Sequence, residues 1–357
     1  MKALFYLTLA AALLTTAASA AAKKSHSRTA AQKADPRQIE AATRLQIFLD
    51  RANFGPGVIN GRYDELTFKA LTLYRQANGQ PLSSPPAKPD SAPDVGGLDL
   101  ASFGPAFVPY TVSEADLHTI GPVPTTPAEQ AKVKFLPYRD TAEAIAEKFH
   151  CDVHFLEQLN PGKTKTLKPG DQLMAPNVEP FELVAIKDLK PGSEAGVPAA
   201  NELSGDENNP IASTNDKSTG ALAPTSVKID TKINMLGVFE ADKLVAAYPV
   251  TIGSAQTASP IGDWKVTRIA KLPRFRYDKE MLKHGERSGN FHMLPPGPNS
   301  PVGVIWIALN KKGIGLHGTN EPETIGRAAS HGCVRLTNWD AVRLAQKIKP
   351  GVPVSIH

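Results

Sequence analysis

The chain has 357 residues, of which 41% are hydrophobic and 21% are charged, and this length and apolar content allow two or three packed domains. The formal net charge is +5, and the basic residues form no stripe interleaved with aromatic residues, so the sequence does not predict nucleic-acid binding. A diffuse positive excess of this size favours contact with an anionic polymer.

The amino terminus has the features of a secretory signal peptide. Lys2 precedes an apolar run from Ala3 to Leu14, and Ala18-Ser19-Ala20 is a small-residue cleavage site, with a second one in the alanines that follow. The apolar run is too short to span a bilayer. No cysteine precedes Cys151, which excludes a lipid-modified cysteine at the cleavage site. We therefore expect a signal peptide at residues 1–20, export, and no membrane span after cleavage.

Residues 36–80 are predicted to form a small α-helical amino-terminal domain. Two helices, each with one apolar face, flank turn signals at Phe54-Gly55-Pro56-Gly57 and Asn60-Gly61, and Asp64 can cap the second helix. The two faces consist of Ile39, Ala42, Leu45 and Leu49, and of Thr67, Ala70, Leu71 and Tyr74. One interpretation is a helical hairpin that binds no ligand.

The same segment resembles the three-helix type of peptidoglycan-binding domain. The resemblance rests on Leu45-Gln46, Pro56-Gly57, Asn60-Gly61, Thr67, Ala70-Leu71 and Tyr74. Asn60 and Asp64 replace the aspartate and the second glycine that this family usually has. The resemblance implies a fold and a role in binding the bacterial cell wall.

Residues 108–180 are predicted to form a small α+β module, after a linker at 81–107 that is rich in Pro, Ser and Gly. Asp152 can cap a short helix that ends at Asn160-Pro161-Gly162. The predicted elements rest on Tyr110-Thr111-Val112, on the face Ala142, Ile145, Ala146 and Phe149, on Val153, Leu156 and Leu159, and on Leu167 to Leu173.

This pattern resembles a LysM-type glycan-binding module with two departures. Arg139 stands where glycine is usual, and about twenty-five extra residues separate the first strand from the helix. Cys151 and His154 have a metal-like spacing, but without a second pair they are interpreted as a core thiol and a surface imidazole.

A second linker is predicted at 188–224, and residues 225–357 then read as a mainly β domain. Its strands are expected at Val227 and Ile229, Leu244 to Ile252, Trp264 to Ile269, Val304 to Leu309 and Ile314 to His317. One helix follows, capped by Asn338 and carrying Val342, Ala345 and Ile348 on its apolar side. We expect Trp264, Trp306 and Trp339 to belong to the core.

One of the two cysteines lies in the run Ser330-His331-Gly332-Cys333-Val334-Arg335, a short loop after His317-Gly318-Thr319. A thiol is mostly protonated at neutral pH, and a nearby imidazole can take its proton to activate it. His317 is the better candidate base, because the strand-like Ile314-Gly315-Leu316 can deliver it across a turn. The backbone N–H groups of Gly332 and Cys333 would then face a developing oxyanion.

The residue types alone leave three other interpretations of Cys333 open. It can be an inert buried thiol, a zinc ligand with His317 and His331, or half of a disulfide with Cys151.

The segment from His317-Gly318-Thr319-Asn320-Glu321-Pro322 to Asn338-Trp339-Asp340 is similar to the signature of the L,D-transpeptidases with a YkuD-type catalytic domain. Upstream, the similarity includes Pro249 to Gly253, Ser259-Pro260-Ile261-Gly262 and Pro295-Pro296-Gly297-Pro298-Asn299; within the segment, it includes Ile325-Gly326-Arg327 and Ser330 to Leu336. It covers about residues 225 to 357. The resemblance implies a β-sandwich with a short helix beside the active site.

The resemblance also implies a chemistry. Cys333 is then the nucleophile that forms a thioester with a tetrapeptide stem of peptidoglycan, His317 the general base and later acid, and the Gly318 carbonyl the group that orients the imidazole. Ser330, His331 and Gly332 support the oxyanion and the site, and Arg335 binds the substrate carboxylate. Carbapenems acylate this family.

The expected function is therefore a peptidoglycan L,D-transpeptidase of the periplasm or cell wall, with stem peptides and glycan strands as partners and with no metal or other cofactor. An inactive wall-binding protein, an L,D-carboxypeptidase and a transferase that anchors proteins to the wall are the alternatives. A Cys/His endopeptidase of the NlpC/P60 type and a sortase fit the order of residues less well. Both cysteines are expected to be thiols, because a disulfide would remove the nucleophile. The sequence does not fix the acyl acceptor or the oligomeric state.

Overall fold

The computed structural model describes residues 35–85, 91–189, 224–253, 259–284, 287–327 and 332–357. The predicted signal peptide, most of the second linker, and the site residues Ser330 and His331 lie outside these ranges. Within the described part of the chain, no helix is both long and apolar enough to cross a membrane.

The amino-terminal unit consists of two helices, α1 (Pro36–Arg51) and α2 (Glu65–Ala77), whose predicted apolar faces pack together. Asp64 caps α2 as predicted, because its carboxylate accepts the Thr67 backbone N–H at 3.0 Å. Two helices, not three, lie between residues 36 and 80. The likeness to a three-helix wall-binding domain therefore stays a prediction.

The proline-rich linker is fastened to α2 by one buried side chain. Arg75 is 4% exposed, and its guanidinium donates to the backbone carbonyls of Pro81, Asp94 and Gly96 at 2.9–3.2 Å. The described parts of residues 81–106 contain no helix or strand. These linker residues stay close to α2 in space because the Arg75 guanidinium donates hydrogen bonds to three of their carbonyl groups.

The second module has a two-stranded antiparallel sheet with short helices between its strands. β1 (Phe107–Thr111) pairs with β2 (Gln172–Pro176), and Tyr110 lies opposite Leu173. Between the strands come α3 (Glu114–Leu117), α4 (Pro127–Gln130), α5 (Thr141–Lys148), α6 (Val153–Leu159) and the 3-10 turn η1 (Thr164–Thr166); η2 (Leu183–Asp188) follows β2. Asp140 and Asp152 cap α5 and α6 through their carboxylates.

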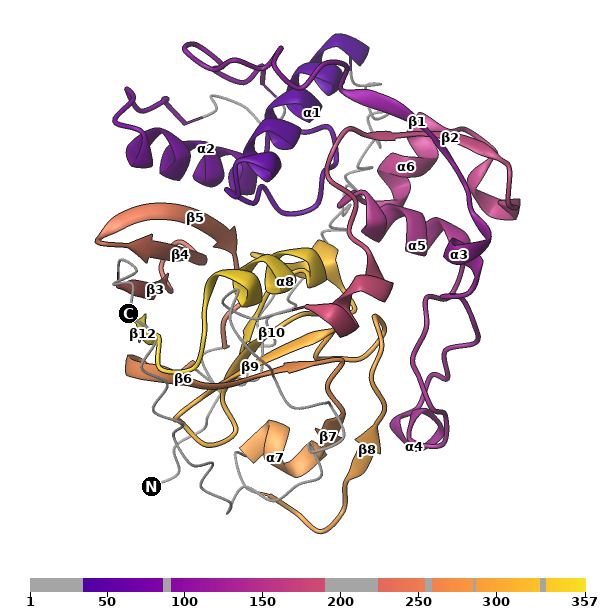
Figure 1. Ribbon diagram of the computed structural model, residues 1–357, viewed down its shortest axis with the longest axis vertical. Helices are drawn as coiled ribbons and strands as arrows, with labels where there is room; N and C mark the ends of the chain where they lie inside the picture. The colour runs from indigo at the N-terminus through magenta and orange to yellow at the C-terminus, as the bar shows by residue number, and fades with distance from the viewer. Residues whose placement is uncertain (1–34, 86–90, 190–223, 254–258, 285–286, 328–331) are drawn as a thin grey trace, which may run out of the picture. The chain divides into compact units, whose positions relative to one another are not determined.

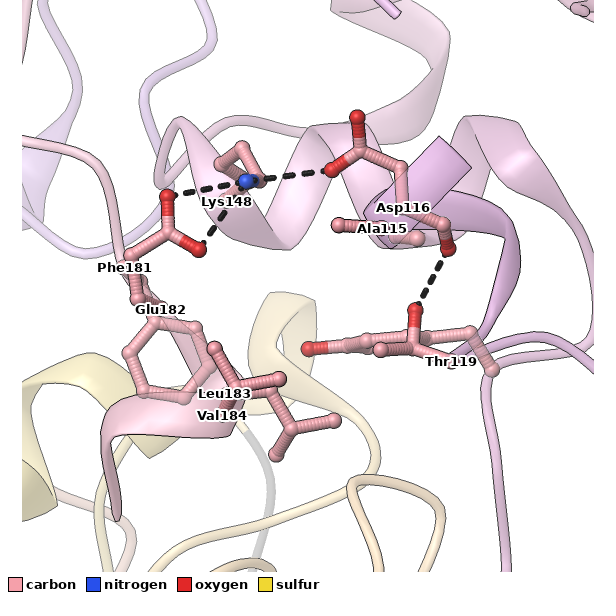
Figure 2. Close-up of a pocket in the computed structure, with 10 residues that line it drawn as sticks. Ala115, Asp116, Thr119, Lys148, Phe181, Glu182, Leu183 and Val184 are labelled. Atoms are coloured by element: carbon pink, nitrogen blue, oxygen red, sulfur yellow. Dashed lines mark hydrogen bonds and ion pairs between the residues drawn. The ribbon is translucent and has the colours of Figure 1, made fainter. Parts of the chain in front are cut away.

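The predicted apolar face of α6 is wrong at one position. Val153 is 41% exposed, and Phe155, which is 2% exposed, takes the buried place beside Leu156. The interpretation of Cys151 as a core thiol and of His154 as a surface imidazole is confirmed, because Cys151 is buried in the core of the second module and His154 is exposed. Beside α5, a small pocket contains Lys148, which bridges the carboxylates of Asp116 and Glu182 at about 3 Å (Figure 2).

The carboxyl-terminal region is mainly β, and its eight strands form one continuous curled sheet whose two halves share β6 and contribute to one apolar core. The strand order is β11-β10-β9-β6-β12-β3-β4-β5. The strands are β3 (Thr225–Asp230), β4 (Met235–Glu240), β5 (Lys243–Pro249), β6 (Gly262–Lys271), β9 (Ile305–Leu309), β10 (Gly315–His317), β11 (Val334–Arg335) and β12 (Pro353–Ile356).

The sheet curls at its longest strand, β6. The first half of β6 pairs with β12 and the second half with β9, with a register shift between Val266 and Arg268. β7 (Phe275–Tyr277) and β8 (His292–Leu294) form a separate hairpin that holds α7 (Lys279–His284) (Figure 1). The core of the curled sheet lies under α8 (Asn338–Lys347), which packs on β9 and β10.

The start of α8 differs from the prediction. Thr337, not Asn338, is the cap, since its hydroxyl accepts the Asp340 backbone N–H at 3.2 Å. Asn338 is the first helical residue, and its side chain turns instead toward the backbone of Val304. Of the three tryptophans, Trp339 is buried as predicted, whereas Trp264 and Trp306 are only half-buried.

The three modules share buried contacts. Met235 and Ala247 of the sheet pack in one apolar cluster with α1 and α2, and the backbone of Ala247 exchanges hydrogen bonds with Asn53 and Gly55. Asp50 of α1 is fully buried and pairs with both guanidinium nitrogens of Arg343 at 2.9 Å and with His150 at 3.0 Å. The modules therefore fold onto the sheet.

Candidate active site

Two adjacent parallel strands bring the predicted nucleophile and base together. In the register of β10 and β11, Leu316 lies opposite Val334 and His317 opposite Arg335. Cys333 directly precedes β11, and its sulfur lies 3.7 Å from the Gly313 carbonyl, near the start of β10. Side chains two residues apart on a strand share a face, so Cys333, Arg335 and His317 lie on the same side of the sheet.

Three contacts fix the ring of His317. It is 4% exposed, its Nδ1 lies 2.6 Å from the Gly318 carbonyl oxygen, and the ring stacks on Trp306 with centroids 5.1 Å apart. A carbonyl can only accept, so Nδ1 carries the proton and Nε2 keeps its lone pair. The predicted contact between His317 and Gly318 is present, and it selects the tautomer that a general base needs.

The electrostatics keep both groups neutral at rest. Burial lowers the pKa of His317 to about 4, the Gly318 hydrogen bond opposes this change, and the Arg335 charge adds to it. Burial also raises the pKa of the Cys333 thiol, while a hydrogen bond from the Gly315 backbone and the Arg335 charge act in the opposite direction. At neutral pH the site therefore holds a thiol and an imidazole.

Arg335 and Trp306 complete the described part of the site. Arg335 is half-buried, and its backbone N–H and carbonyl exchange hydrogen bonds with Thr251 at 2.9 and 3.0 Å. Trp306 was predicted to be core, but it stands beside His317 because β9 places these two residues opposite each other. The alternation of residues in β9 could have predicted this position of Trp306. Ile305, Ile307 and Leu309 occupy the buried face of the strand, which puts Trp306 on the opposite face.

The backbone just before the nucleophile is unusual. Gly332 has a φ of 108°, a region that other residues adopt only with strain, and it is buried. This conformation is compatible with the predicted oxyanion role of the N–H groups of Gly332 and Cys333. Ser330 and His331, the other two predicted support residues, lie outside the described residues.

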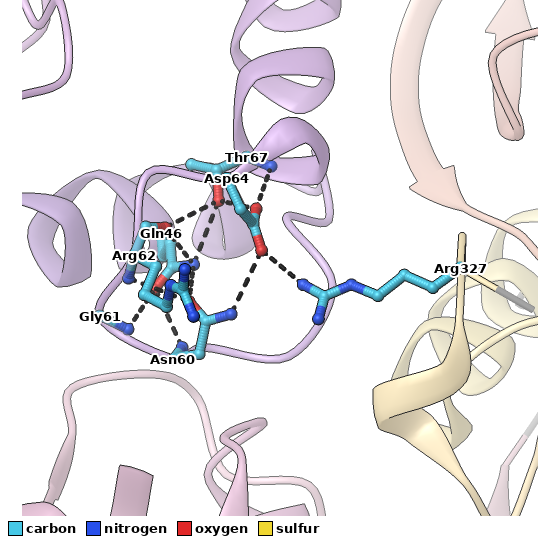
Figure 3. Close-up of polar contacts among 7 residues, drawn as sticks. All are labelled: Gln46, Asn60, Gly61, Arg62, Asp64, Thr67 and Arg327. Atoms are coloured by element: carbon cyan, nitrogen blue, oxygen red, sulfur yellow. Dashed lines mark hydrogen bonds and ion pairs between the residues drawn. The ribbon is translucent and has the colours of Figure 1, made fainter. Parts of the chain in front are cut away.

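The loop upstream of the nucleophile is held by the amino-terminal unit. Arg327 donates to the Asp64 carboxylate at 2.6 Å, and Asp64 also accepts from Asn60 at 3.2 Å (Figure 3). A Cβ added at Gly326 would lie 2.6 Å from the Leu66 side chain, so only glycine fits this approach. This contact could not be predicted from the sequence, because its two sides are more than 250 residues apart.

The remaining interpretations of the cysteines concern disulfides and metals. Cys151 and Cys333 are not joined in a disulfide. Cys151 lies in the core of the second module, where burial raises the pKa of its thiol well above the usual value. Among the described residues, no group of three or more His, Cys, Asp or Glu side chains is placed to hold a metal ion.

The fold and this geometry agree with comparisons to known proteins. A family model of the L,D-transpeptidase catalytic domain, YkuD, matches residues 224–356. The chain is 30% identical over 133 residues to the protein YkuD of Bacillus licheniformis, covering 37% of this chain and 66% of that protein. It is 32% identical over 135 residues to YqjB of Bacillus subtilis, covering 36% of this chain and 69% of that protein, and both relatives carry L,D-transpeptidase names. The chain belongs to the YkuD family of L,D-transpeptidase catalytic domains.

The match to the YkuD family concerns the carboxyl-terminal region. It spans about two thirds of the length of these two relatives. A solved L,D-transpeptidase from Mycobacterium smegmatis aligns with a TM-score of 0.31 and 19% identity, over 38% of this chain and 59% of that chain. The YkuD-family domain begins at residue 224, so the resemblances of the two preceding modules to wall-binding domains stay predictions.

Proposed function

We propose that this chain is a peptidoglycan L,D-transpeptidase that works through a thioester on Cys333. The observation that carries the proposal is the fixed ring of His317, whose Nδ1–H is held by Gly318 and whose strand lies beside that of the cysteine. Membership in the YkuD family supplies the substrate class. A neutral imidazole buried beside a thiol fits a general base that acts only during attack.

The reaction has two steps. Nε2 of His317 takes the thiol proton as the sulfur attacks the stem carbonyl, the S–C bond forms, and the peptide bond to the terminal D-alanine breaks. The imidazolium gives its proton to the departing amine. An acceptor amine then attacks the thioester, His317 removes its proton, and the thiol is restored.

The other site residues have roles in this scheme. In this scheme the N–H groups of Gly332 and Cys333 stabilise the oxyanion. Ser330 and His331 are proposed to support the active site, and Arg335, on the same face as His317, binds the stem carboxylate. The same scheme with water as acceptor gives the L,D-carboxypeptidase reaction.

The proposal extends to the whole chain. The signal peptide at residues 1–20 directs export to the periplasm or cell wall. The helical unit and the LysM-like module bind glycan strands and bring the catalytic domain to its polymer. No cofactor takes part.

Product analysis tests this function. The full-length protein is incubated with purified disaccharide-tetrapeptides, and the products are separated and weighed by mass spectrometry. We expect release of D-alanine together with a dimer that is cross-linked through its diaminopimelate residues. Release without a dimer assigns the carboxypeptidase activity instead. The absence of any product would reject catalysis and favour a wall-binding protein.

A further inference from the structure

Asn338 stands directly behind the residue that orients the catalytic imidazole. Its Oδ1 accepts the Val304 backbone N–H at 3.1 Å. A Cβ added at Gly303 or at Gly318 would lie 2.0 or 2.1 Å from this oxygen, so the amide is wedged between two glycines. The Gly318 carbonyl in turn accepts the Nδ1–H of His317 at 2.6 Å. The position of the Asn338 amide therefore limits where that carbonyl can lie.

The other end of the same amide is held by a different module. Nδ2 of Asn338 donates to Oε1 of Glu147 at 2.8 Å, and Glu147 belongs to α5 of the second module. Glu147 is 7% exposed and Asn338 is 1% exposed, so water does not compete for this bond. An amide that accepts at one end and donates at the other cannot flip without losing both bonds, since its nitrogen cannot accept from Val304.

We infer that Glu147 is a positioning residue for His317, acting across the module boundary through Asn338 and Gly318. The inference rests on the proposed function for its link to turnover, but the geometry it predicts exists without substrate. It gives the second module a role in forming the catalytic site. When the Glu147 bond is lost, the Asn338 amide is held only by Val304 and the two glycines, and the Gly318 carbonyl holds the Nδ1–H tautomer less strictly.

The experiment compares two replacements of one side chain in the full-length protein. Glu147→Met keeps the length but removes the acceptor, whereas Glu147→Gln keeps an oxygen for Asn338. The first readout is the tautomer of His317 in long-range ¹H–¹⁵N spectra of histidine-labelled protein, with the signal assigned by its loss in His317→Asn. The second is kcat and KM for release of D-alanine. Glu147→Ala replaces the methionine variant if that variant does not fold.

We expect the methionine variant to show a mixed His317 tautomer and a kcat roughly tenfold lower with KM unchanged, because small displacements of a catalytic group are costly. The glutamine variant should keep the wild-type tautomer and rate. The matched control is Glu182→Gln, which removes an ion pair with Lys148 in the same module (Figure 2) and should match the wild type.

Two results would overturn the inference: a wild-type tautomer in the methionine variant, or an equal change in the glutamine variant. An inactive wild-type protein would reject the proposed function alone. The tautomer comparison would still decide the role of Glu147.

Discussion

At the scale of single residues, the sulfur of Cys333 is the group that the chemistry cannot replace. We expect Cys333→Ala to abolish turnover, because no thioester can form, while the melting temperature stays within about 2 °C of the wild type, since alanine fits the space of a half-buried cysteine. D-alanine release and thermal unfolding measure the two effects. Turnover by a folded alanine variant would refute the assignment.

His317 should control how fast Cys333 is acylated. We expect carbapenems to open on the Cys333 thiol and give an adduct that intact-protein mass spectrometry detects. Without its base, only the small ionised fraction of a thiol whose pKa is raised can attack, so His317→Ala should slow the adduct on the order of 100-fold. Cys151→Ser is the control and should react like the wild type, because Cys151 lies in the core of another module. An adduct mapped to Cys151 would contradict this pairing.

The predicted contact of His317 with the Gly318 carbonyl is present because these two residues are neighbours along the chain, and the roles of Cys333, His317 and Gly318 stay predictions. The sequence did not predict Trp306 or Glu147 as neighbours of the site, since their contacts depend on the pairing of β9 with β10 and on the docking of α5 against α8. The prediction that Asn338 caps α8 was wrong for a related reason. Thr337 and Asn338 are both good caps, and the choice is made by the Val304 N–H, which lies across the fold.

At the scale of elements, the strands with strong alternation were predicted and the pairing order was not. β4 and β12 were missed, although each is paired on both sides within the sheet. β12 reaches its place beside β3 as a parallel neighbour after more than a hundred intervening residues. Periodicity along a chain contains no information about which strands pair. The curl of the sheet has the same origin, because β6 divides its hydrogen bonds between β12 and β9.

The helices that join the modules should make stability depend on pH. Burial raises the pKa of Glu147 to about 8 and that of Asp340 to about 7. Between about pH 4.5 and 8 the folded protein retains protons that the unfolded chain releases, so the stability that these groups contribute is complete below that range and is lost as the pH rises. Buried His317 and His150, whose pKa values are lowered, act in the opposite direction, so the prediction concerns the difference between two proteins. We expect the change in melting temperature from pH 5 to pH 8 to be more negative in the wild type than in Glu147→Gln, by on the order of 2 °C.

The comparison needs a control for general effects of charge. Glu182→Gln removes a carboxylate that is not buried and should retain the wild-type slope. Identical slopes for the wild type and Glu147→Gln would contradict a buried, protonated Glu147.

At the scale of the whole molecule, residues 35–189 complete the core of the catalytic region. A truncated chain that starts at Thr225 would expose Met235, which is 2% exposed in the full chain, and would remove Asp50, the carboxylate that accepts two hydrogen bonds from Arg343. Each large apolar side chain that returns to water costs about 1.5–3 kcal/mol. We expect this truncation to be less stable than the full chain by on the order of 3 kcal/mol, as measured by chemical denaturation.

A chain that starts at Asp35 is the matched control, because it keeps every contact described here. It should unfold at the denaturant concentration of the full-length protein. Equal stability of the chain that starts at Thr225 would show that the shared contacts contribute little.

The buried trio of Asp50, His150 and Arg343 also bears on how such proteins can be recombined. Each of its members comes from a different module, and the Asp50 carboxylate is paired only by His150 and Arg343 from the other two among its described contacts. A chimera that imports only a foreign catalytic domain would leave Asp50 buried without its guanidinium. Engineers who exchange modules within this family should therefore transfer the trio as a set, treating Arg343 as the counterpart of a residue that lies 293 positions earlier.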